Sequence, residues 1–280
     1  MCTLVLLFRP DRPWPLMLGA NRDEMRDRPW RPPGRHWPAQ PEVVAGLDLL
    51  GGGSWLGLNR ATGVVAAILN RRGSLGPEPG KRSRGELVLR ALAAESASAA
   101  AAALAGAAAA DYRSFNLVVA DRQAAVWLRH LGPEAGRGPE ARPLPVGLTL
   151  LTAGDRNDLS SPRIRRYLPR LEAAEPPDPE AGDWTAWQAI LADRGDPEAP
   201  NPMADPMAAM NLGLPSGFGT VSSSLIALGQ KPGGQKPGGQ KPAGQKPAGQ
   251  KPAGRGPDLR WLFAAGRPDE LPYLPVNLHD

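Results

Sequence analysis

Cysteine is almost absent from this chain: the single cysteine among 280 residues is Cys2. One cysteine excludes an intramolecular disulfide, and it also excludes a cysteine-based metal or iron–sulfur cluster. Histidine is scarce too, and the three histidines stand far apart, at His36, His130 and His279. Each is interpreted as a surface or core histidine rather than an axial haem ligand. We therefore expect no metal site and no cofactor.

Acidic residues are missing from one stretch, the five copies of Gly-Gln-Lys-Pro-Gly/Ala that fill residues 229–253. The formal net charge is +5, and removing the five repeat lysines from the 33 basic residues leaves 28, equal to the number of acidic residues. The rest of the chain is neutral, so the basic excess does not predict nucleic-acid binding. Because the repeat has no apolar residue larger than alanine, residues 229–255 are interpreted as a disordered surface insertion. A polycationic docking arm is the alternative.

Long hydrophobic runs are also missing. No apolar stretch approaches the roughly 20 residues of a membrane-spanning helix. The opening run 2–8 is too short for the apolar core of a signal peptide, and it runs into arginine and proline. We therefore expect a cytoplasmic protein without membrane insertion. The residues outside the repeat, about 255, are enough for one α/β or α+β domain with a substantial core.

The position of the lone cysteine is its most informative property. A residue as small as cysteine after Met1 normally permits removal of the methionine, which leaves Cys2 with a free α-amine beside its own thiol. Such an amine has a pKa of roughly 7.7–8.0 and a free thiol roughly 8.5, so the amine can act as the base for the thiol near neutral pH. The alternative is that Cys2 is a small apolar residue at the start of a buried strand.

The start of the chain is predicted to form a β-hairpin, because two short apolar runs flank a segment rich in turn formers. A turn centred between residues 11 and 12 places Cys2 opposite Asn21. Asn21 and Asp23 then flank the thiol, whereas Arg22 points to the other face. A slip of one residue would exchange these roles. An ammonium group beside the thiol favours the thiolate, so we expect a lowered thiol pKa.

The remaining pattern predicts an α+β fold. The alanine-rich stretch 87–110 is expected to form two helices because Ser96 and Ser98 interrupt it, and Ser83–Glu86 is a capping-box sequence at its start. The Gly51–Gly57 run is interpreted as a close-packed turn, because it lacks the lysine and hydroxyl residue of a phosphate-binding loop. Strands are expected at 2–8, 14–21, 64–69, 115–121, 124–131, 148–152, 219–228 and 259–265, helices at 160–171 and 183–193, and an irregular loop at 30–41. This order predicts two antiparallel sheets covered by helices.

Six short motifs occur in order along most of the chain. They are Met-Cys at the start, Ala20-Asn-Arg-Asp-Glu24, Gly52-Gly-Ser-Trp-Leu-Gly57, Ser83-Arg-Gly85, Phe115-Asn-Leu-Val118 and Phe218-Gly-Thr220. With these motifs the chain resembles the NRDE family, also called the transport and Golgi organisation family. That family in turn resembles N-terminal-nucleophile hydrolases of the choloylglycine hydrolase and penicillin V acylase type. The resemblance implies a four-layer αββα sandwich with the mature N-terminal cysteine at the tip of a central strand. We expect residues 1–280 to form a single domain of this kind, with the repeat at 229–255 as an insertion.

The resemblance also implies roles for individual residues. Cys2 corresponds to the nucleophile, Asp23 to the carboxylate that holds its amine, and Asn70 lies near an oxyanion donor. Motif residues are assigned to substrate binding: Asn21, Arg22, Asn116 and Thr220.

The sequence departs from the hydrolase pattern at three positions. Ala20 stands where the hydrolases carry an arginine, for which Arg22 is a substitute on the opposite face of the predicted strand. A second asparagine is expected just after residue 152, where the chain has alanine and glycine, unless Asn157 takes its place. Val221 replaces an arginine found in many family members. Loss of one oxyanion donor lowers the rate of a hydrolase by roughly 10²–10³.

Two functions therefore stay open. The first is hydrolysis of a small N-acyl amide by an N-terminal cysteine. The second, suggested by the family resemblance, is non-enzymatic binding and trafficking of haem or a fatty acyl-CoA. A basic group could hold the phosphates of such a ligand or be solvated surface: Arg71, Arg72, Lys81 and Arg82. The expected partner is in both cases a small amphipathic molecule. A role in protein interaction alone is a third alternative, but it does not explain Cys2 together with Asp23.

Overall fold

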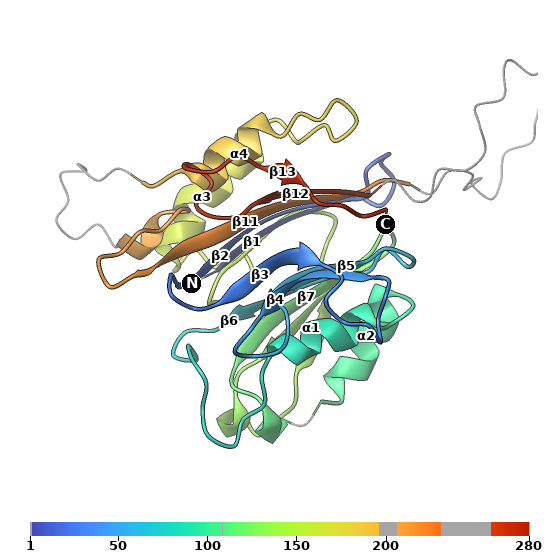
Figure 1. The fold of residues 1–280 in the computed structure, drawn as a ribbon, viewed down its shortest axis with the longest axis vertical. Coiled ribbons are helices and arrows are strands. Elements are labelled where there is room, and N and C mark those ends of the chain that lie inside the picture. The colour runs from blue at the N-terminus through green and yellow to red at the C-terminus, as the bar shows by residue number, and fades with distance from the viewer. Residues whose placement is uncertain (1, 108, 196–205, 231–258, 280) are drawn as a thin grey trace, which may run out of the picture.

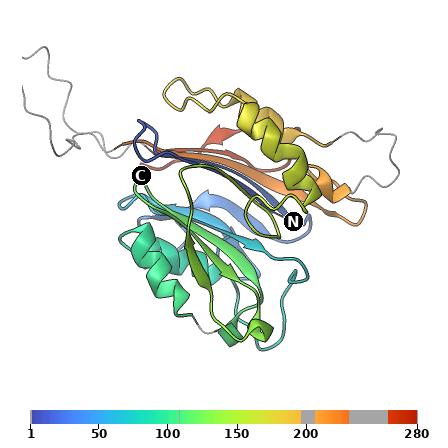
Figure 2. The same cartoon turned by 180° about the vertical axis from the view of Figure 1, so that it is seen from behind.

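The computed structural model describes residues 2–107, 109–195, 206–230 and 259–279, and these residues form four layers (Figure 1). Two antiparallel sheets lie face to face, and a pair of helices covers the outer face of each. The predicted αββα sandwich is therefore confirmed. Figure 2 shows the same layers from behind, with the two helix pairs on opposite sides of the molecule.

The first sheet has six strands in the order β10-β1-β2-β11-β12-β13. Its strands are β1 (Thr3–Phe8), β2 (Leu16–Met25), β10 (Gly147–Leu151), β11 (Phe218–Leu228), β12 (Leu259–Ala264) and β13 (Leu274–Pro275). The predicted hairpin of β1 and β2 is confirmed, but its register differs by one residue. Thr3 lies opposite Asn21, where Cys2 was expected. Asn21 and Asp23 therefore face away from Cys2, and the slip follows from a seven-residue turn between Phe8 and Leu16, which form the last pair.

The second sheet has seven strands in the order β3-β4-β5-β6-β7-β8-β9. They are β3 (Trp30–Gly34), β4 (Val43–Asp48), β5 (Leu56–Asn59), β6 (Val65–Asn70), β7 (Phe115–Ala120), β8 (Ala125–His130) and β9 (Glu140–Pro143). The expected irregular loop at 30–41 is partly wrong, because its first five residues form β3. The strands that the sequence did not predict include β3, β4 and β9. Of these, β3 and β9 are edge strands that contain proline, and an edge strand needs hydrogen bonds on one side only.

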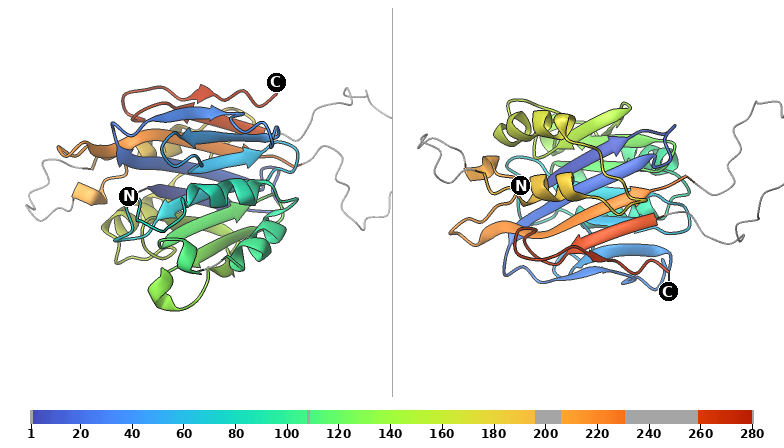
Figure 3. Two further views of the ribbon diagram at one scale, coloured as in Figure 1. Left: turned by 60° about the horizontal axis from the view of Figure 1, so that its bottom comes forward. Right: turned by 90° about the horizontal axis from the view of Figure 1, so that it is seen from above.

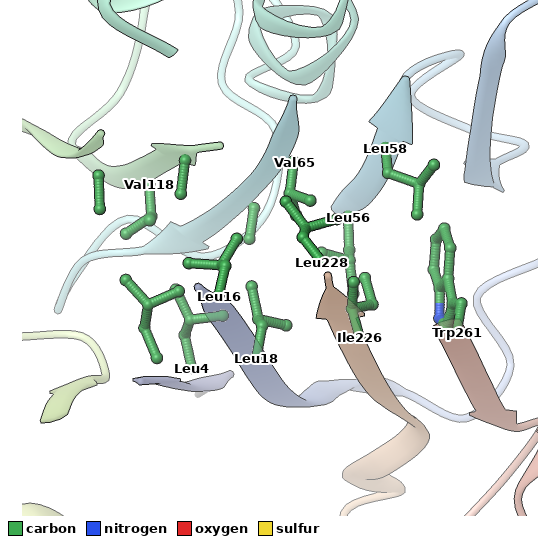
Figure 4. Packing of buried hydrophobic residues seen from close by; sticks show 14 of the residues in the cluster. Leu4, Leu16, Leu18, Leu56, Leu58, Val65, Val118, Ile226, Leu228 and Trp261 are labelled. Atoms are coloured by element: carbon green, nitrogen blue, oxygen red, sulfur yellow. The ribbon is translucent and has the colours of Figure 1, made fainter. Parts of the chain in front are cut away.

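The main hydrophobic core lies between the two sheets. Figure 4 shows leucines of the first sheet, among them Leu4, Leu16 and Leu18, packed against Leu56 and other side chains of the second. Every second residue of β1 and β2 points into this core, and the intervening residues point toward the helices. Burial of each such leucine contributes about 1.5–3 kcal/mol. The alternation fixes which side chains reach the space between the sheets.

The four helices are α1 (Gly85–Leu92), α2 (Ala97–Ala105), α3 (Pro162–Ala173) and α4 (Thr185–Ala192). The predicted break in the alanine-rich stretch is confirmed, and Ser96 caps α2 by accepting a hydrogen bond from the Ala99 N–H. The predicted capping box of α1 is wrong: Glu86 bonds the Tyr112 hydroxyl and pairs with Arg82.

Helices α3 and α4 lie across the first sheet, as the views in Figure 3 show. Gly19 of β2 permits this contact, because a Cβ there would lie 3.1 Å from the ring of Trp187. Strands β11 and β12 pair directly, so the segment between them joins two neighbouring strands as expected. Most of the lysine repeat, residues 231–255, lies outside the described residues. Among the described residues, no helix has the length and apolar character needed to cross a membrane.

Candidate active site

The side chain of Cys2 lies at the edge of the space between the sheets, where β1 begins. It lines a cavity of about 360 Å³ together with residues of β2, β6 and the loop before α1. The Asp23 N–H donates a hydrogen bond of 3.4 Å to the Cys2 sulfur, and the thiol lies 3.6 Å from the Asp23 carbonyl oxygen. Such a cavity is within the size range of small-molecule sites, roughly 300–1,000 Å³. The backbone of Asp23 thus holds the thiol at a cavity of ligand size.

Burial raises the pKa of the Cys2 thiol, and the negative charge of Asp23 adds to this effect. A hydrogen bond from the Asp23 backbone and the charge of Arg22 act in the opposite direction, but they do not outweigh it. This direction holds for the chain with Met1 in place. The lowered pKa expected for Cys2 with a free α-amine stays a prediction. A thiol with a raised pKa is protonated at neutral pH and is a poor nucleophile until a base removes its proton.

The Asp23 carboxylate is buried on the helix-covered face of the first sheet. Its Oδ2 accepts a hydrogen bond of 3.0 Å from Nη1 of Arg163, and its Oδ1 accepts one of 2.7 Å from the Thr220 hydroxyl. Arg163 also donates to the Thr3 hydroxyl at 2.6 Å. Asp23 is 2% exposed and Arg163 is 3% exposed. This buried ion pair joins α3 to β1, β2 and β11 beside residue 2.

Arg22 lies on the face of β2 that was predicted for its neighbours, and it lines the same cavity as Cys2. Its guanidinium is 4.1 Å from the ring centre of Trp55, which is favourable for a cation on an aromatic face. Burial lowers the pKa of Arg22, although the charges of Cys2 and Asp48 partly compensate. The register of β1 and β2 differs by one residue from the predicted one, and this difference brings Arg22 to the cavity. The cavity therefore has an arginine although Ala20 stands where the hydrolases carry theirs.

Asn70, the last residue of β6, also lines the cavity. The wall continues through the glycine-rich turn, where a Cβ on Gly53 would lie 2.4 Å from the carbonyl carbon of Gly85. The Ser54 N–H donates to the Gly85 carbonyl oxygen at 3.1 Å. The interpretation of this run as a close-packed turn is therefore confirmed. It fixes the start of α1 and the preceding Arg84 at the rim of the cavity.

Basic residues outnumber acidic ones, six to four, in the lining of the cavity. Burial lowers the pKa of Arg84 to about 10, and the charge of Arg113 adds to this effect. The cationic residues that line the cavity are Arg22, Arg28, Lys81, Arg82, Arg84 and Arg113. Two of the four basic residues singled out in the sequence, Lys81 and Arg82, thus belong to this cavity. Arg71 and Arg72 line a neighbouring, more open depression of about 560 Å³, which shares Glu78, Lys81 and Arg113 with the cavity. Arg71 pairs with Asp155 at 2.7 Å.

Three of the four residues assigned to substrate binding do not line this cavity. Asn21 bonds the carbonyl oxygens of Leu191 and Met210, which ties α4 to the sheet. Asn116 is fully buried and bonds the Thr152 and Gly154 carbonyl oxygens. Thr220 holds Asp23 as described above. Their positions indicate structural and positioning roles.

The asparagine that could have supplied a second oxyanion donor is also engaged elsewhere. The Asn157 side chain accepts a hydrogen bond of 2.7 Å from the Leu150 N–H, and this residue does not line the cavity. The three histidines lie outside the cavity lining as well. Within the described part of the chain, no three acidic, cysteine or histidine side chains gather as a metal site would require.

Two site residues were missed in the sequence. Arg163 is separated from Asp23 by 140 positions, and the only local signal was a basic residue in the first turn of a helix, where basic side chains are unfavourable. Trp55 belongs to the motif at residues 52–57, and its ring supports the Arg22 guanidinium. The ring fits there because Gly46 has no side chain: a Cβ on Gly46 would lie 2.3 Å from the Trp55 ring.

The fold and the site define a four-layer αββα sandwich with a cysteine at the start of an interior strand. Residues 1–149 match the model of the protein family described as transport and Golgi organisation 2. The chain belongs to this family. It is 34% identical over 131 residues to the mouse protein described as transport and Golgi organization 2 homolog. That match covers 43% of this chain and 45% of the mouse protein, so it spans less than half of the relative's length.

A solved structure is also similar to this chain. It is the Caenorhabditis elegans N-acylethanolamine-hydrolyzing acid amidase ortholog, which is 12% identical and has a TM-score of 0.48. The similarity covers 80% of this chain and 92% of that structure.

Proposed function

We propose that the protein is an N-terminal-cysteine amide hydrolase that acts on a small N-acyl substrate after removal of Met1. The observation that carries this proposal is the position of the Cys2 thiol. It is bonded to the Asp23 backbone in a cavity of about 360 Å³, which Asn70 also lines. A lone buried thiol in a core would need neither a cavity nor polar groups around it.

The reaction follows from the groups at residue 2. The α-amine of Cys2 accepts the thiol proton while the sulfur attacks the amide carbonyl carbon, which forms a C–S bond and a tetrahedral oxyanion. The ammonium then protonates the leaving nitrogen, the C–N bond breaks, and an amine departs from a thioester. Water attacks the thioester with the amine again as base, and the acid leaves as the thiol regains its proton. The site supplies every proton transfer without a cofactor.

The surrounding residues have separate tasks in this scheme. The Asp23 carboxylate, fixed by Arg163 and Thr220, orients the ammonium form of the amine. Asn70 donates a hydrogen bond to the oxyanion, as the amide side chain of an asparagine can. An ammonium group beside the sulfur favours the thiolate, which offsets the raised thiol pKa seen with Met1 in place.

A second candidate function is the binding and trafficking of an amphipathic anion such as a fatty acyl-CoA or haem. The excess of basic residues favours it, because six cationic and four acidic residues line the cavity, and phosphate or carboxylate groups suit the cations. The family name also refers to transport. In this case Cys2 would contribute to the shape of the cavity, and Met1 could remain in place.

The experiment that separates the two candidates begins with intact mass spectrometry. The proposal expects loss of Met1, turnover of a panel of N-acyl amines and N-acyl amino acids by the mature protein, and no turnover by Cys2→Ala. Cys2→Ser, which keeps a weaker nucleophile at the same position, serves as the matched variant and should retain slow turnover. Retention of Met1 in most molecules, or ligand affinity unchanged in Cys2→Ala without any turnover in the mature protein, would favour the carrier.

A further inference from the structure

We infer that Arg22 is an anion-binding residue and that the cavity takes amides with a carboxylate or phosphate group near the scissile bond. This inference deepens the proposed function and rests on it for the position of the amide. The binding of the anion itself depends only on the geometry of Arg22 and its neighbours. The two parts can therefore fail separately.

The first observation is that Arg22 is buried without a matching acceptor. Its side chain is 4% exposed, and among the described residues Nη1 has no hydrogen-bond partner. Nη2 lies 3.5 Å from Oδ2 of Asp48, at the limit of a hydrogen bond. The same oxygen accepts a shorter bond of 2.8 Å from Nε of Arg28. Asp48 is thus mainly engaged elsewhere, because its other oxygen accepts two backbone N–H groups.

A buried cation of this kind is costly unless an anion compensates it. Burial is the leading cause that lowers the pKa of Arg22, in agreement with incomplete compensation. An anionic ligand with two oxygens would accept bonds from the free edge of the guanidinium, which is the geometry that arginine forms with carboxylates and phosphates.

The second observation is that the orientation of Arg22 is fixed. Its guanidinium lies 4.1 Å from the ring centre of Trp55 and 6.0 Å from that of Trp30, and these two rings meet edge to face at 5.8 Å. The absence of a side chain at Gly46 gives Trp55 its place. A stacked guanidinium loses less conformational freedom on binding than a mobile lysine would. The site is therefore formed before the ligand arrives.

The third observation concerns the other charges that line the cavity. The acidic residues there already have cationic partners: Asp23 pairs with Arg163, Glu24 and Asp48 with Arg28, and Glu78 with Arg113. Arg84 has only neutral acceptors among the described residues, the hydroxyl of Ser74 and the carbonyl oxygen of Ser114. The cavity thus keeps an excess of positive charge at Arg22 and Arg84. Because Cys2 lines the same cavity, an anion at Arg22 lies close to the reacting sulfur.

The test compares ligands that share one acyl chain and differ in charge. Binding to a Cys2→Ala protein, which cannot turn over, is measured by calorimetry for N-octanoylglycine, N-octanoylethanolamine and octyl phosphate. We expect N-octanoylglycine to bind at least tenfold more tightly than the neutral N-octanoylethanolamine. This preference should fall to less than twofold with Arg22→Gln and be partly kept with Arg22→Lys, which retains the charge but not the fork. Tighter binding of octyl phosphate, lost in the same variant, would identify phosphate as the favoured group.

The matched control is Arg60→Gln, which removes a partly buried arginine outside the cavity that pairs with Glu42 at 3.1 Å. It should keep the full preference, and melting temperatures report whether each variant is folded. Equal affinity for the charged and neutral ligands, or a preference that survives Arg22→Gln, would overturn the inference. Turnover of neutral amides by the mature protein would then still support the proposed hydrolase. Conversely, Arg22-dependent anion binding without any turnover would retain the anion site and reject the hydrolase.

Discussion

The buried ion pair between Arg163 and Asp23 gives the sharpest stability prediction. Replacing Arg163 by methionine keeps most of the side-chain volume but removes the cation 3.0 Å from Oδ2 of Asp23. The carboxylate is fully buried and keeps a bond from the Thr220 hydroxyl. Removal of one partner from a buried ion pair typically costs about 3–5 kcal/mol. We expect Arg163→Met to lower the free energy of unfolding by that amount.

The same reasoning predicts strong coupling between the two residues. Asp23→Asn alone leaves the Arg163 cation without its carboxylate and is also destabilising. The double variant Asp23→Asn/Arg163→Met buries no charge at this position, so its loss should be at least 2 kcal/mol smaller than the sum of the two single losses. Coupling of this size is at the upper end of what contacting residues show, about 0.5–3 kcal/mol.

The assay is urea unfolding followed by tryptophan fluorescence. The unmodified protein, the two single variants and the double variant form a double-mutant cycle, and their free energies are compared when all four have the same m-value. Arg170→Met on the same helix is the control, because Arg170 pairs with Asp193 at a far more exposed position. Exposed pairs contribute about 0–1 kcal/mol. A loss below 1 kcal/mol for Arg163→Met, or additive losses in the cycle, would refute the reasoning.

Three further predictions concern the glycine turn, the α2 cap and the thiol. Gly53→Ala should lower the free energy of unfolding by about 1–3 kcal/mol in the same urea assay, because the added Cβ meets the backbone of Gly85. The control Gly106→Ala should not, because a Cβ there lies 3.8 Å from its nearest neighbour, the carbonyl oxygen of Ala103. Ser96→Ala should cost about 1 kcal/mol by loss of the cap, and Ser98→Ala nothing comparable. With Met1 retained, iodoacetamide should alkylate Cys2 at pH 7 more slowly than free cysteine, since the thiol pKa is raised, and the rate should increase with pH. With Met1 retained, Asp23→Asn should speed alkylation, because it removes a charge that raises the thiol pKa. After removal of Met1 the same substitution should slow alkylation, because Asp23 no longer orients the amine. Mass spectrometry follows both rates, and a change in the same direction in both forms contradicts the assigned role of Asp23.

Local patterns were enough to predict most of the fold. The β1–β2 hairpin, the two alanine-rich helices and the serine cap at Ser96 each depend on residues that are close in sequence. Strands β3 and β9 were missed because an edge strand can contain proline and charge, which removes the alternation that identifies interior strands. The interior strand β4 was missed too, and it contains Gly46, a residue type that is depleted in strands. The capping box failed because Glu86 has a better partner in Tyr112, 26 residues away.

The candidate site depends on details that the sequence specifies less directly. The turn composition identified the hairpin but not the length of its turn, and one residue decides which face each side chain occupies. This slip moved Arg22 to the cavity and Asn21 away from it. The contact between Arg163 and Asp23 depends on the packing of α3 on the sheet, which residue types alone do not predict.

The arrangement of side chains around β1 and β2 gives a physical reason why such a site would use an N-terminal residue. The Cys2 thiol and Arg22 line the cavity, whereas the Asp23 carboxylate faces α3 with Arg163. Side chains on opposite faces of a strand cannot meet, but the backbone of a strand runs between the two faces. A free α-amine on Cys2 is such a backbone group, placed so that Asp23 can act on it from one side and the thiol can use it from the other. With Met1 attached this link is an amide, and the carboxylate then acts on the thiol only as a nearby charge that raises its pKa.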